Sequence, residues 1–256
     1  MRSATGGLLI LATLLAQAWS SAFAAPAAAT EEATKEIYLD EPAVIPPPVV
    51  VTSGKLQDKY EDGALRLERE VRKMSDDSLV NHGAYVEYYP NGQKFAEGTY
   101  DNGVHDGRWR FWHDNGQLCK TVTFKKGRAD GAWEVLRADG TLQAKKSYKD
   151  SKRDGLWVTY HDDGKTPLAE ENYVNGKREG VSRSYFANGK PQREINYKAD
   201  LPDGLFTEWD DSGRKIGEVN FKAGKKHGAL IQYRPDGTVI EQMYDEGRLV
   251  NDEAGG

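Results

Sequence analysis

Glycine recurs along this chain at an interval of 24 residues, with a single step of 25. A second glycine series lies between the members of the first, and most of its members follow Asn or Asp. Asn-Gly and Asp-Gly pairs accept the positive φ angles of a type I′ turn between antiparallel strands, so each repeat predicts one β-hairpin. The first glycine series is Gly83, Gly107, Gly131, Gly155, Gly180, Gly204 and Gly228, and the second is Gly92, Gly116, Gly140, Gly164, Gly189, Gly213 and Gly237.

Aromatic side chains follow the same period. One usually stands two residues after a first-series glycine, another stands five residues after it, and a third ends the next strand. Because side chains alternate between the faces of a strand, positions two and five face opposite sides unless a β-bulge intervenes. Stacked hairpins would then carry aromatic rows on both faces. The third position holds Tyr100, Phe124, Tyr148, Tyr173, Tyr197, Phe221 and Tyr244.

The fold class predicted is an all-β repeat protein. We expect an antiparallel β-hairpin ladder, or meander, of about seven to eight 24-residue repeats forming an elongated twisted sheet. An irregular copy with a turn at 60–63 and a strand at 65–71 precedes the regular repeats, and it is expected to cap the ladder. The sequence does not fix the curvature, so a sandwich or a closed barrel is the alternative.

Residues 1–24 have the pattern of a secretory signal peptide. Arg2 precedes an apolar run from Leu8 to Ala18, and Ala22-Phe23-Ala24 offers a cleavage site. The run is too short to span a bilayer, so we expect cleavage after Ala24, no transmembrane segment afterwards, and a periplasmic or secreted protein. An uncleaved membrane anchor is the alternative.

Three further segments complete the expected organisation. Residues 25–55 are rich in Pro, Ala and Glu and predict a disordered linker with polyproline II character, although docking into a partner's aromatic groove is an alternative. Residues 56–250 form the repeat domain, and residues 251–256 form a polar tail. Cys119 is the one cysteine and cannot form an internal disulfide, so no chemistry is assigned to it.

The charge pattern argues against nucleic acid as a partner. The formal net charge is −5, and lysines and arginines alternate with acidic neighbours instead of gathering in a basic patch. A protein that grips phosphates needs such a patch to displace their counterions.

Candidate catalytic and metal-binding residues all have a periodic explanation. The acidic residues gather in Asp-Gly turn elements, where Asp bonds its own nearby backbone. His113 and His161 occupy the same position two repeats apart, about 19 Å in an open sheet, which is too far to share a metal. We therefore predict surface turn positions for the histidines, and no catalytic residue, metal or cofactor. Calcium bound by the acidic turns is the alternative.

Three quoted segments carry a family resemblance: YYPNGQ at 88–93, GTYDNG at 98–103 and DGRW at 106–109. They resemble the MORN-repeat variant of YwqK-type antitoxin repeat proteins, over about residues 56 to 248. The resemblance implies antiparallel hairpin ladders that bind other proteins, and MORN repeats at large are associated with scaffolding and with membrane lipids. An antitoxin role implies a cytoplasmic setting, whereas the signal peptide predicts an exported member.

Three functions are consistent with these observations. The first is an exported, non-enzymatic scaffold that binds an unknown protein partner in the cell envelope through a sheet face or an edge strand. The second is a module that binds envelope glycans on exposed tryptophan rings, and the third is an antitoxin-like protein that neutralises a toxin. Exposure of the rings separates the first two, because covered rings belong to the core. The candidate interaction surface consists of Trp109, Trp112, Trp133, Trp157 and Trp209.

Overall fold

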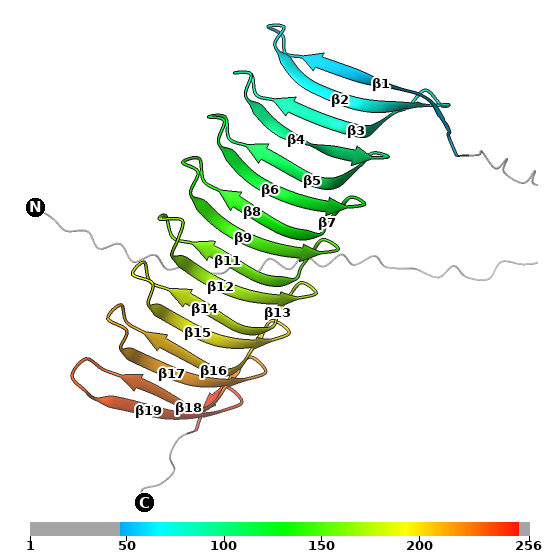
Figure 1. Ribbon diagram of the computed structural model, residues 1–256. Helices are drawn as coiled ribbons and strands as arrows, with labels where there is room; N and C mark the ends of the chain where they lie inside the picture. Colours follow the sequence, from blue (N-terminus) through cyan, green and yellow to red (C-terminus); the bar gives the residue numbers. More distant parts are fainter. Residues whose placement is uncertain (1–46, 251–256) are drawn as a thin grey trace, which may run out of the picture. The chain divides into compact units, whose positions relative to one another are not determined.

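The repeats form one continuous antiparallel sheet. The computed structural model describes residues 47–250, and the expected signal peptide, most of the linker and the polar tail lie outside them. Each strand pairs with its neighbours in chain order, and Figure 1 shows the resulting stack of hairpins from β1 to β19. The strands are β1 (Val50–Lys59), β2 (Leu65–Met74), β3 (Leu79–Tyr88), β4 (Lys94–Asp101), β5 (Val104–Trp112), β6 (Leu118–Lys125), β7 (Arg128–Ala129), β8 (Gly131–Leu136), β9 (Leu142–Lys149), β10 (Lys152–Arg153), β11 (Gly155–Tyr160), β12 (Pro167–Val174), β13 (Lys177–Arg178), β14 (Gly180–Tyr185), β15 (Pro191–Lys198), β16 (Leu201–Trp209), β17 (Lys215–Lys222), β18 (Lys225–Tyr233), β19 (Val239–Asp245) and β20 (Arg248–Leu249).

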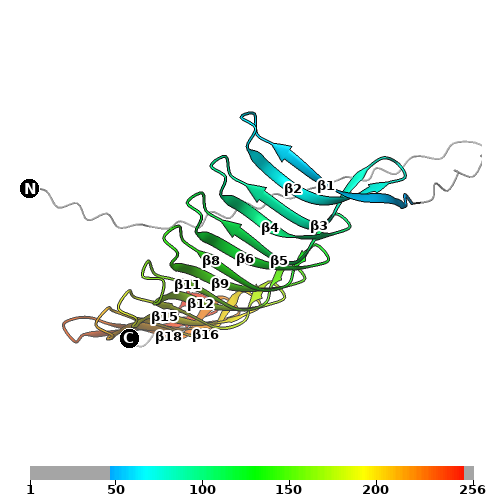
Figure 2. The ribbon, with the colours of Figure 1, turned by 45° about the horizontal axis from the view of Figure 1, so that its top comes forward.

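The expected hairpin ladder is confirmed, and the sheet is open. In the part of the chain that the structure describes, β1 pairs with β2 alone and does not meet the last strands, so the barrel alternative is wrong. The sheet is twisted and bent along its length, as Figure 2 shows. Residues 47–250 contain no helix long and apolar enough to cross a membrane.

The sheet begins earlier than expected, and the irregular copy forms its first hairpin without protecting the edge at β1. β1 starts at Val50, inside the segment assigned to the linker from its composition. The turn at 60–63 joins β1 to β2, with the Gly63 amide donating to the Tyr60 carbonyl at 3.0 Å. The irregular copy therefore supplies the first hairpin of the ladder.

The turns of the second glycine series are not of the predicted type I′. At the second-series pair Asn91-Gly92 only the glycine has positive φ, 80°, and its amide donates to the Tyr89 carbonyl at 2.9 Å, which is a type I turn followed by a glycine bulge. The turn at the other end of the hairpin carries the type I′ signature, since both Asn102 (φ 46°) and Gly103 (φ 84°) are positive. Asn-Gly fits either turn, so the pair alone did not distinguish them.

First-series glycines lie opposite the aromatic residues that end the outgoing strands. The pairs are Gly83↔Tyr100, Gly107↔Phe124, Gly131↔Tyr148, Gly155↔Tyr173, Gly180↔Tyr197, Gly204↔Phe221 and Gly228↔Tyr244. A glycine leaves its side of the strand pair open, so the opposite ring can lie across the backbone. The periodic glycines and the periodic aromatic residues therefore face each other across paired strands.

The core is a layer of side chains on one face of the sheet. Ala96, Trp109 and Val122 are buried together, and the rings of Tyr85, Tyr100, Phe111, Phe124 and Trp133 pack against them. These residues come from the neighbouring strands β3 to β8, so the burial arises between hairpins and not within one. This face is called the aromatic face below.

Candidate functional site

The aromatic face carries a nearly unbroken row of rings. Tyr85 contacts Trp109 with ring centroids 5.4 Å apart, and Trp109 contacts Tyr100 at 5.0 Å. Further along, Tyr148 links Trp133 to Trp157 through centroid distances of 4.5 and 5.1 Å, and Trp157 reaches Tyr173 at 5.3 Å. Such tilted and edge-on contacts stabilise the row beyond simple burial. Trp133 and Trp157 thus lie in one row, with Tyr148 between them.

The three tryptophans of this row differ in exposure. Trp109 is 2% exposed and Trp157 is 8% exposed, whereas Trp133 is half-buried. The indole nitrogens of Trp109 and Trp157 donate to the carbonyls of Thr99 at 3.0 Å and Ser147 at 2.8 Å. The rings of Trp109 and Trp157 are therefore part of the core and offer no flat surface to a ligand.

The other two candidate tryptophans lie on the opposite face. Trp112 follows Trp109 by three residues in β5. The unpaired residue of the bulge beside Trp112 is Cys119 in β6, so the side chains of β5 keep alternating between the two faces of the sheet. The Lys94 ammonium lies 5.6 Å from the Trp112 ring centroid and also binds Glu97 at 2.7 Å. Trp209 has the same place in its own repeat. The five candidate tryptophans thus do not form a single surface.

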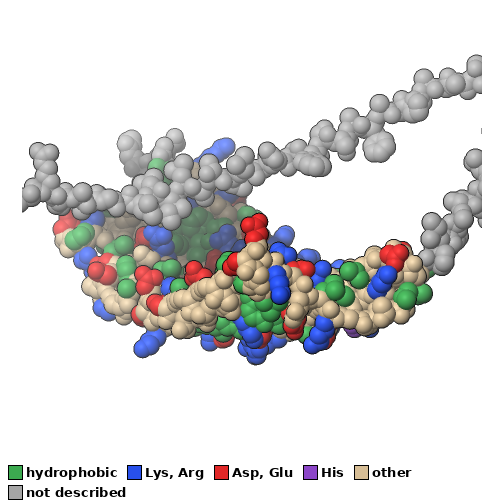
Figure 3. Space-filling model, turned by 90° about the horizontal axis from the view of Figure 1, so that it is seen from above, with side chains coloured by type: hydrophobic (Ala, Val, Ile, Leu, Met, Phe, Trp, Pro, Cys, Tyr) green, Lys and Arg blue, Asp and Glu red, His purple; other side chains and the backbone are tan. Residues whose placement is uncertain are grey.

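Charged pairs occupy the face opposite the aromatic row, which is called the charged face below. Glu97 binds Arg110 at 2.8 Å across β4 and β5, and Arg183 binds Glu194 at 2.7 Å across β14 and β15. Burial acts to raise the pKa of Glu97, but hydrogen bonds from Lys94 and Arg110 hold this pKa below its usual 4.5. Figure 3 shows acidic and basic side chains interspersed on the side of the molecule that it draws. A surface of balanced sign suits solubility better than capture of a highly charged polymer.

The histidines in repeated positions join neighbouring repeats. The His113 ring nitrogen Nε2 lies 3.0 Å from the Leu136 carbonyl, and His161 Nε2 lies 3.0 Å from the Tyr185 carbonyl. Tyr89 uses the same position to donate to the Trp112 carbonyl at 2.9 Å. Both histidines lie at the turns, as expected, and their rings are half-buried. Tyr89, His113 and His161 are spaced by multiples of 24 residues because each bonds a carbonyl of the following repeat.

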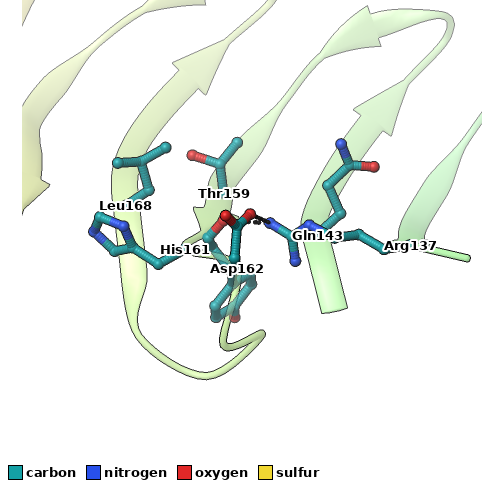
Figure 4. A pocket seen from close by; sticks show the side chains of 7 residues that line it. Arg137, Gln143, Thr159, His161, Asp162 and Leu168 are labelled. Atoms are coloured by element: carbon teal, nitrogen blue, oxygen red, sulfur yellow. Dashed lines mark hydrogen bonds and ion pairs between the residues drawn. The ribbon is translucent and has the colours of Figure 1, made fainter. Parts of the chain in front are cut away.

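A hollow of about 420 Å³ lies next to His161 and contains a partly buried arginine (Figure 4). The Arg137 guanidinium donates to the carbonyls of Leu142 and Tyr160, both at 2.8 Å, and lies 3.5 Å from Asp162. Its donors are thus directed at backbone groups of two repeats. The hollow is lined by Arg137, Gln143, Thr159, Tyr160, His161, Asp162 and Leu168.

The acidic turn residues bond the turns that contain them. Asp163 accepts hydrogen bonds from the Lys165 amide at 2.9 Å and from Thr166, and these bonds lower its pKa to about 2. Bonds from Ser212 and Arg214 lower the pKa of Asp210 to about 2 in the same way. These carboxylates are thus held in place by hydrogen bonds within their own turns.

Among residues 47–250, one group of three side chains brings metal-ligand atoms together. His227 Nδ1 lies 3.1 Å from Asp245, and Glu246 lies within 4.8 Å of both. The Lys225 ammonium binds Glu246 at 3.2 Å and lowers its pKa. That ammonium already supplies the positive charge that a cation would bring, so the group is a surface ion-pair cluster.

Comparison with known sequences supports the repeat assignment in part. The MORN repeat variant profile matches residues 81–102, 106–126 and 178–199. The first two segments cover the hairpins that contain Tyr85 and Trp109, and the third includes β14 and β15. No curated protein matches the chain. These three segments are thus similar to the MORN repeat variant.

Proposed function

We propose that this protein is an exported, non-enzymatic scaffold that binds a protein partner in the cell envelope. Repeats of the MORN type typically serve as protein-interaction or membrane-binding modules. The observation that carries the proposal is the open edge at β1. This strand pairs with β2 on one side, and its other side leaves backbone donors and acceptors unpaired by any described residue.

An open edge is suited to an extended segment of another protein. Such a segment adds as a further strand through main-chain hydrogen bonds, and pockets for its side chains then set specificity. Val49 and Val51 beside this edge are 66% and 64% exposed, so apolar contacts accompany the backbone groups. Unprotected edges promote aggregation in other proteins, and a bound partner strand would cover this one.

The burial of the aromatic row disfavours the glycan-binding alternative. Sugars stack on flat, solvent-facing rings, whereas Trp109 and Trp157 are covered by neighbouring aromatic side chains. The antitoxin alternative requires the cytoplasm, and the signal-peptide pattern of residues 1–24 is the argument for export.

The edge is tested by replacing Val51 with lysine. The wild-type chain and Val51→Lys are used as bait in the envelope fraction, with Val239→Lys as the matched control, since Val239 is 55% exposed near the far end of the sheet. A charged edge residue discourages strand addition, so capture of the partner should fall for Val51→Lys and persist for Val239→Lys. Equal capture by both variants would exclude β1 as the docking site.

Export has a separate test. Mass spectrometry of the protein from its native host should find a mature N-terminus near Ala25. An intact Met1 terminus recovered from the cytoplasm would contradict export and favour the antitoxin-like function.

A further inference from the structure

The aromatic row contains a gap in the repeat that begins at Gly180. Two residues after the first-series glycine, the preceding repeats have Tyr85, Trp109, Trp133 and Trp157, and the following repeat has Phe206. The repeat between them has Ser182. Ring contacts run along the row as far as Trp157 and Tyr173 and stop there.

The gap is a hollow of about 310 Å³ on the aromatic face. Small side chains from β12 and β14 are part of its lining, namely Ala169, Ser182 and Ser184. The rest of the lining comes from Glu171, Arg183, Arg193, Ile195, Tyr197 and Phe206. An aromatic ring in this place would lie between Tyr173 and Tyr197, as Trp157 lies between Tyr148 and Tyr173.

The Ser182 hydroxyl gives a second, independent sign of an incomplete site. Ser182 is 8% exposed, and its Oγ is buried without a hydrogen-bond partner among the described residues. A buried polar group without a partner is unfavourable, so its persistence calls for an explanation. The negative face of an aromatic ring that enters the hollow could accept this hydroxyl, which leaves the N–H of an indole for another acceptor.

The neighbouring repeat shows how an indole would fit. There the Ser147 carbonyl accepts two hydrogen bonds, one from the Asp154 amide at 3.1 Å and one from Trp157 Nε1 at 2.8 Å. The corresponding carbonyl beside the gap belongs to Asn172, which accepts the Glu179 amide at 2.9 Å. A carbonyl oxygen has two lone pairs, so Asn172 can accept an indole N–H in the same way.

We propose that this hollow binds an aromatic side chain of a partner protein, a tryptophan best of all, which completes the row from outside. The inference rests on the proposed scaffold function for the partner, while the site itself rests on the gap, the buried hydroxyl and the carbonyl of Asn172. Tryptophan is the side chain that three equivalent positions already use, and buried aromatic anchors carry much of the binding energy in protein interfaces.

The site is tested with a small probe on the full chain. N-acetyl-tryptophanamide is titrated while NMR signals of Ser182, Tyr197 and Phe206 are followed, with N-acetyl-alaninamide as the control probe. We expect saturable shifts confined to the hollow for the indole probe alone. Absence of saturable shifts with the wild-type chain would overturn the proposal.

Filling the hollow provides the matched variants. Ser182→Trp should restore the row, raise the melting temperature and weaken probe binding by about tenfold or more, since the ring occupies the hollow. Leu156→Trp adds the same side chain on the opposite face, where Leu156 is 48% exposed and does not line the hollow, and should bind the probe as the wild type does. If Ser182→Trp does not fold, Ser182→Phe tests the same point with the ring of the next repeat. A filled variant that binds the probe as tightly as the wild type would contradict the proposal.

Partner capture separates this inference from the proposed function. Failure of the wild-type chain to capture any envelope protein would contradict the scaffold function, while the probe titration would still decide whether the hollow binds an indole. A partner captured equally well by the wild type and by folded Ser182→Trp would exclude the hollow as its docking site and leave the scaffold function standing.

Discussion

The indole ring of Trp109 lies directly on Gly98. A Cβ atom at position 98 would fall within the ring, because Cδ2, Cε2 and Cγ of Trp109 occupy that space. Gly98 lies between Tyr85 and Trp109 on the aromatic face, and the indole nitrogen donates to the adjacent Thr99 carbonyl at 3.0 Å. The burial of Trp109 at 2% exposure therefore depends on the absence of a side chain at Gly98 in the neighbouring strand β4.

Replacing Gly98 with alanine should destabilise the protein. The methyl group forces the Trp109 ring out of place, and overpacking of this kind costs about 1–3 kcal/mol. Gly54→Ala is the matched control, since a Cβ at Gly54 meets nothing within 4 Å and should change stability by less than about 0.5 kcal/mol. Urea melts followed by tryptophan fluorescence compare the two variants. An equal midpoint for Gly98→Ala and the wild type would contradict the packing described for Trp109.

Gly140 tests the turns of the second glycine series. Its φ is 84°, in the left-handed region that a β-branched residue strongly disfavours, so Gly140→Val should cost about 1–3 kcal/mol. Gly140→Asn is the control, because Asn tolerates this conformation and should lose much less stability. Thermal melts by circular dichroism measure both. Equal melting temperatures for Gly140→Val and Gly140→Asn would contradict a steric cost of valine at this turn.

The sequence predicted the fold because each residue type that recurs at fixed spacing has a local structural role. Glycines and aromatics at fixed spacing marked the turns and the facing residues, and the pairing of Gly155 with Tyr173 follows that spacing directly. The turn types were not predictable, since Asn-Gly pairs suit both a type I′ turn and a type I turn with a glycine bulge. The bond of His113 to the next repeat was missed, although Tyr89 and His161 occupy the equivalent position in other repeats.

The candidate site was harder to predict than the fold. Periodicity directs attention to positions that keep the pattern, such as Trp109 and Trp157, and the structure buries these in the core. The hollow lies where the pattern fails, at Ser182, and a missing aromatic has no meaning until the neighbouring rings are placed. The face of Trp112 could not be assigned either, because a bulge could have lain in either strand.

His105 should make stability depend on pH. Its ring stacks on Phe124 at 4.9 Å and contacts Tyr100, and burial lowers its pKa from the usual 6.5. The unfolded chain therefore binds more protons than the folded chain as the pH falls through 6.5, so stability is lost on acidification. Melting temperatures measured from about pH 8 to about pH 5.5 should fall more steeply for the wild type than for His105→Phe, which keeps a ring in place. Parallel curves for the two chains would exclude His105 as a source of the dependence.

Trp157→Ala separates a core role from a ligand-binding role for the aromatic row. Trp157 is 8% exposed, contacts the rings of Tyr148 and Tyr173, and has the Arg153 guanidinium 4.4 Å from its ring centroid. Removing this ring should cost about 3–5 kcal/mol, the range for aromatic deletions in cores. Trp209→Ala is the matched control, because Trp209 is half-buried on the charged face and should cost less. Denaturant melts of both variants are run beside a glycan-array assay of the wild type. A stable Trp157→Ala protein that had lost a measurable glycan affinity would contradict the core role and make the row a sugar-binding surface, because a ring that binds sugar in solvent contributes little to folding.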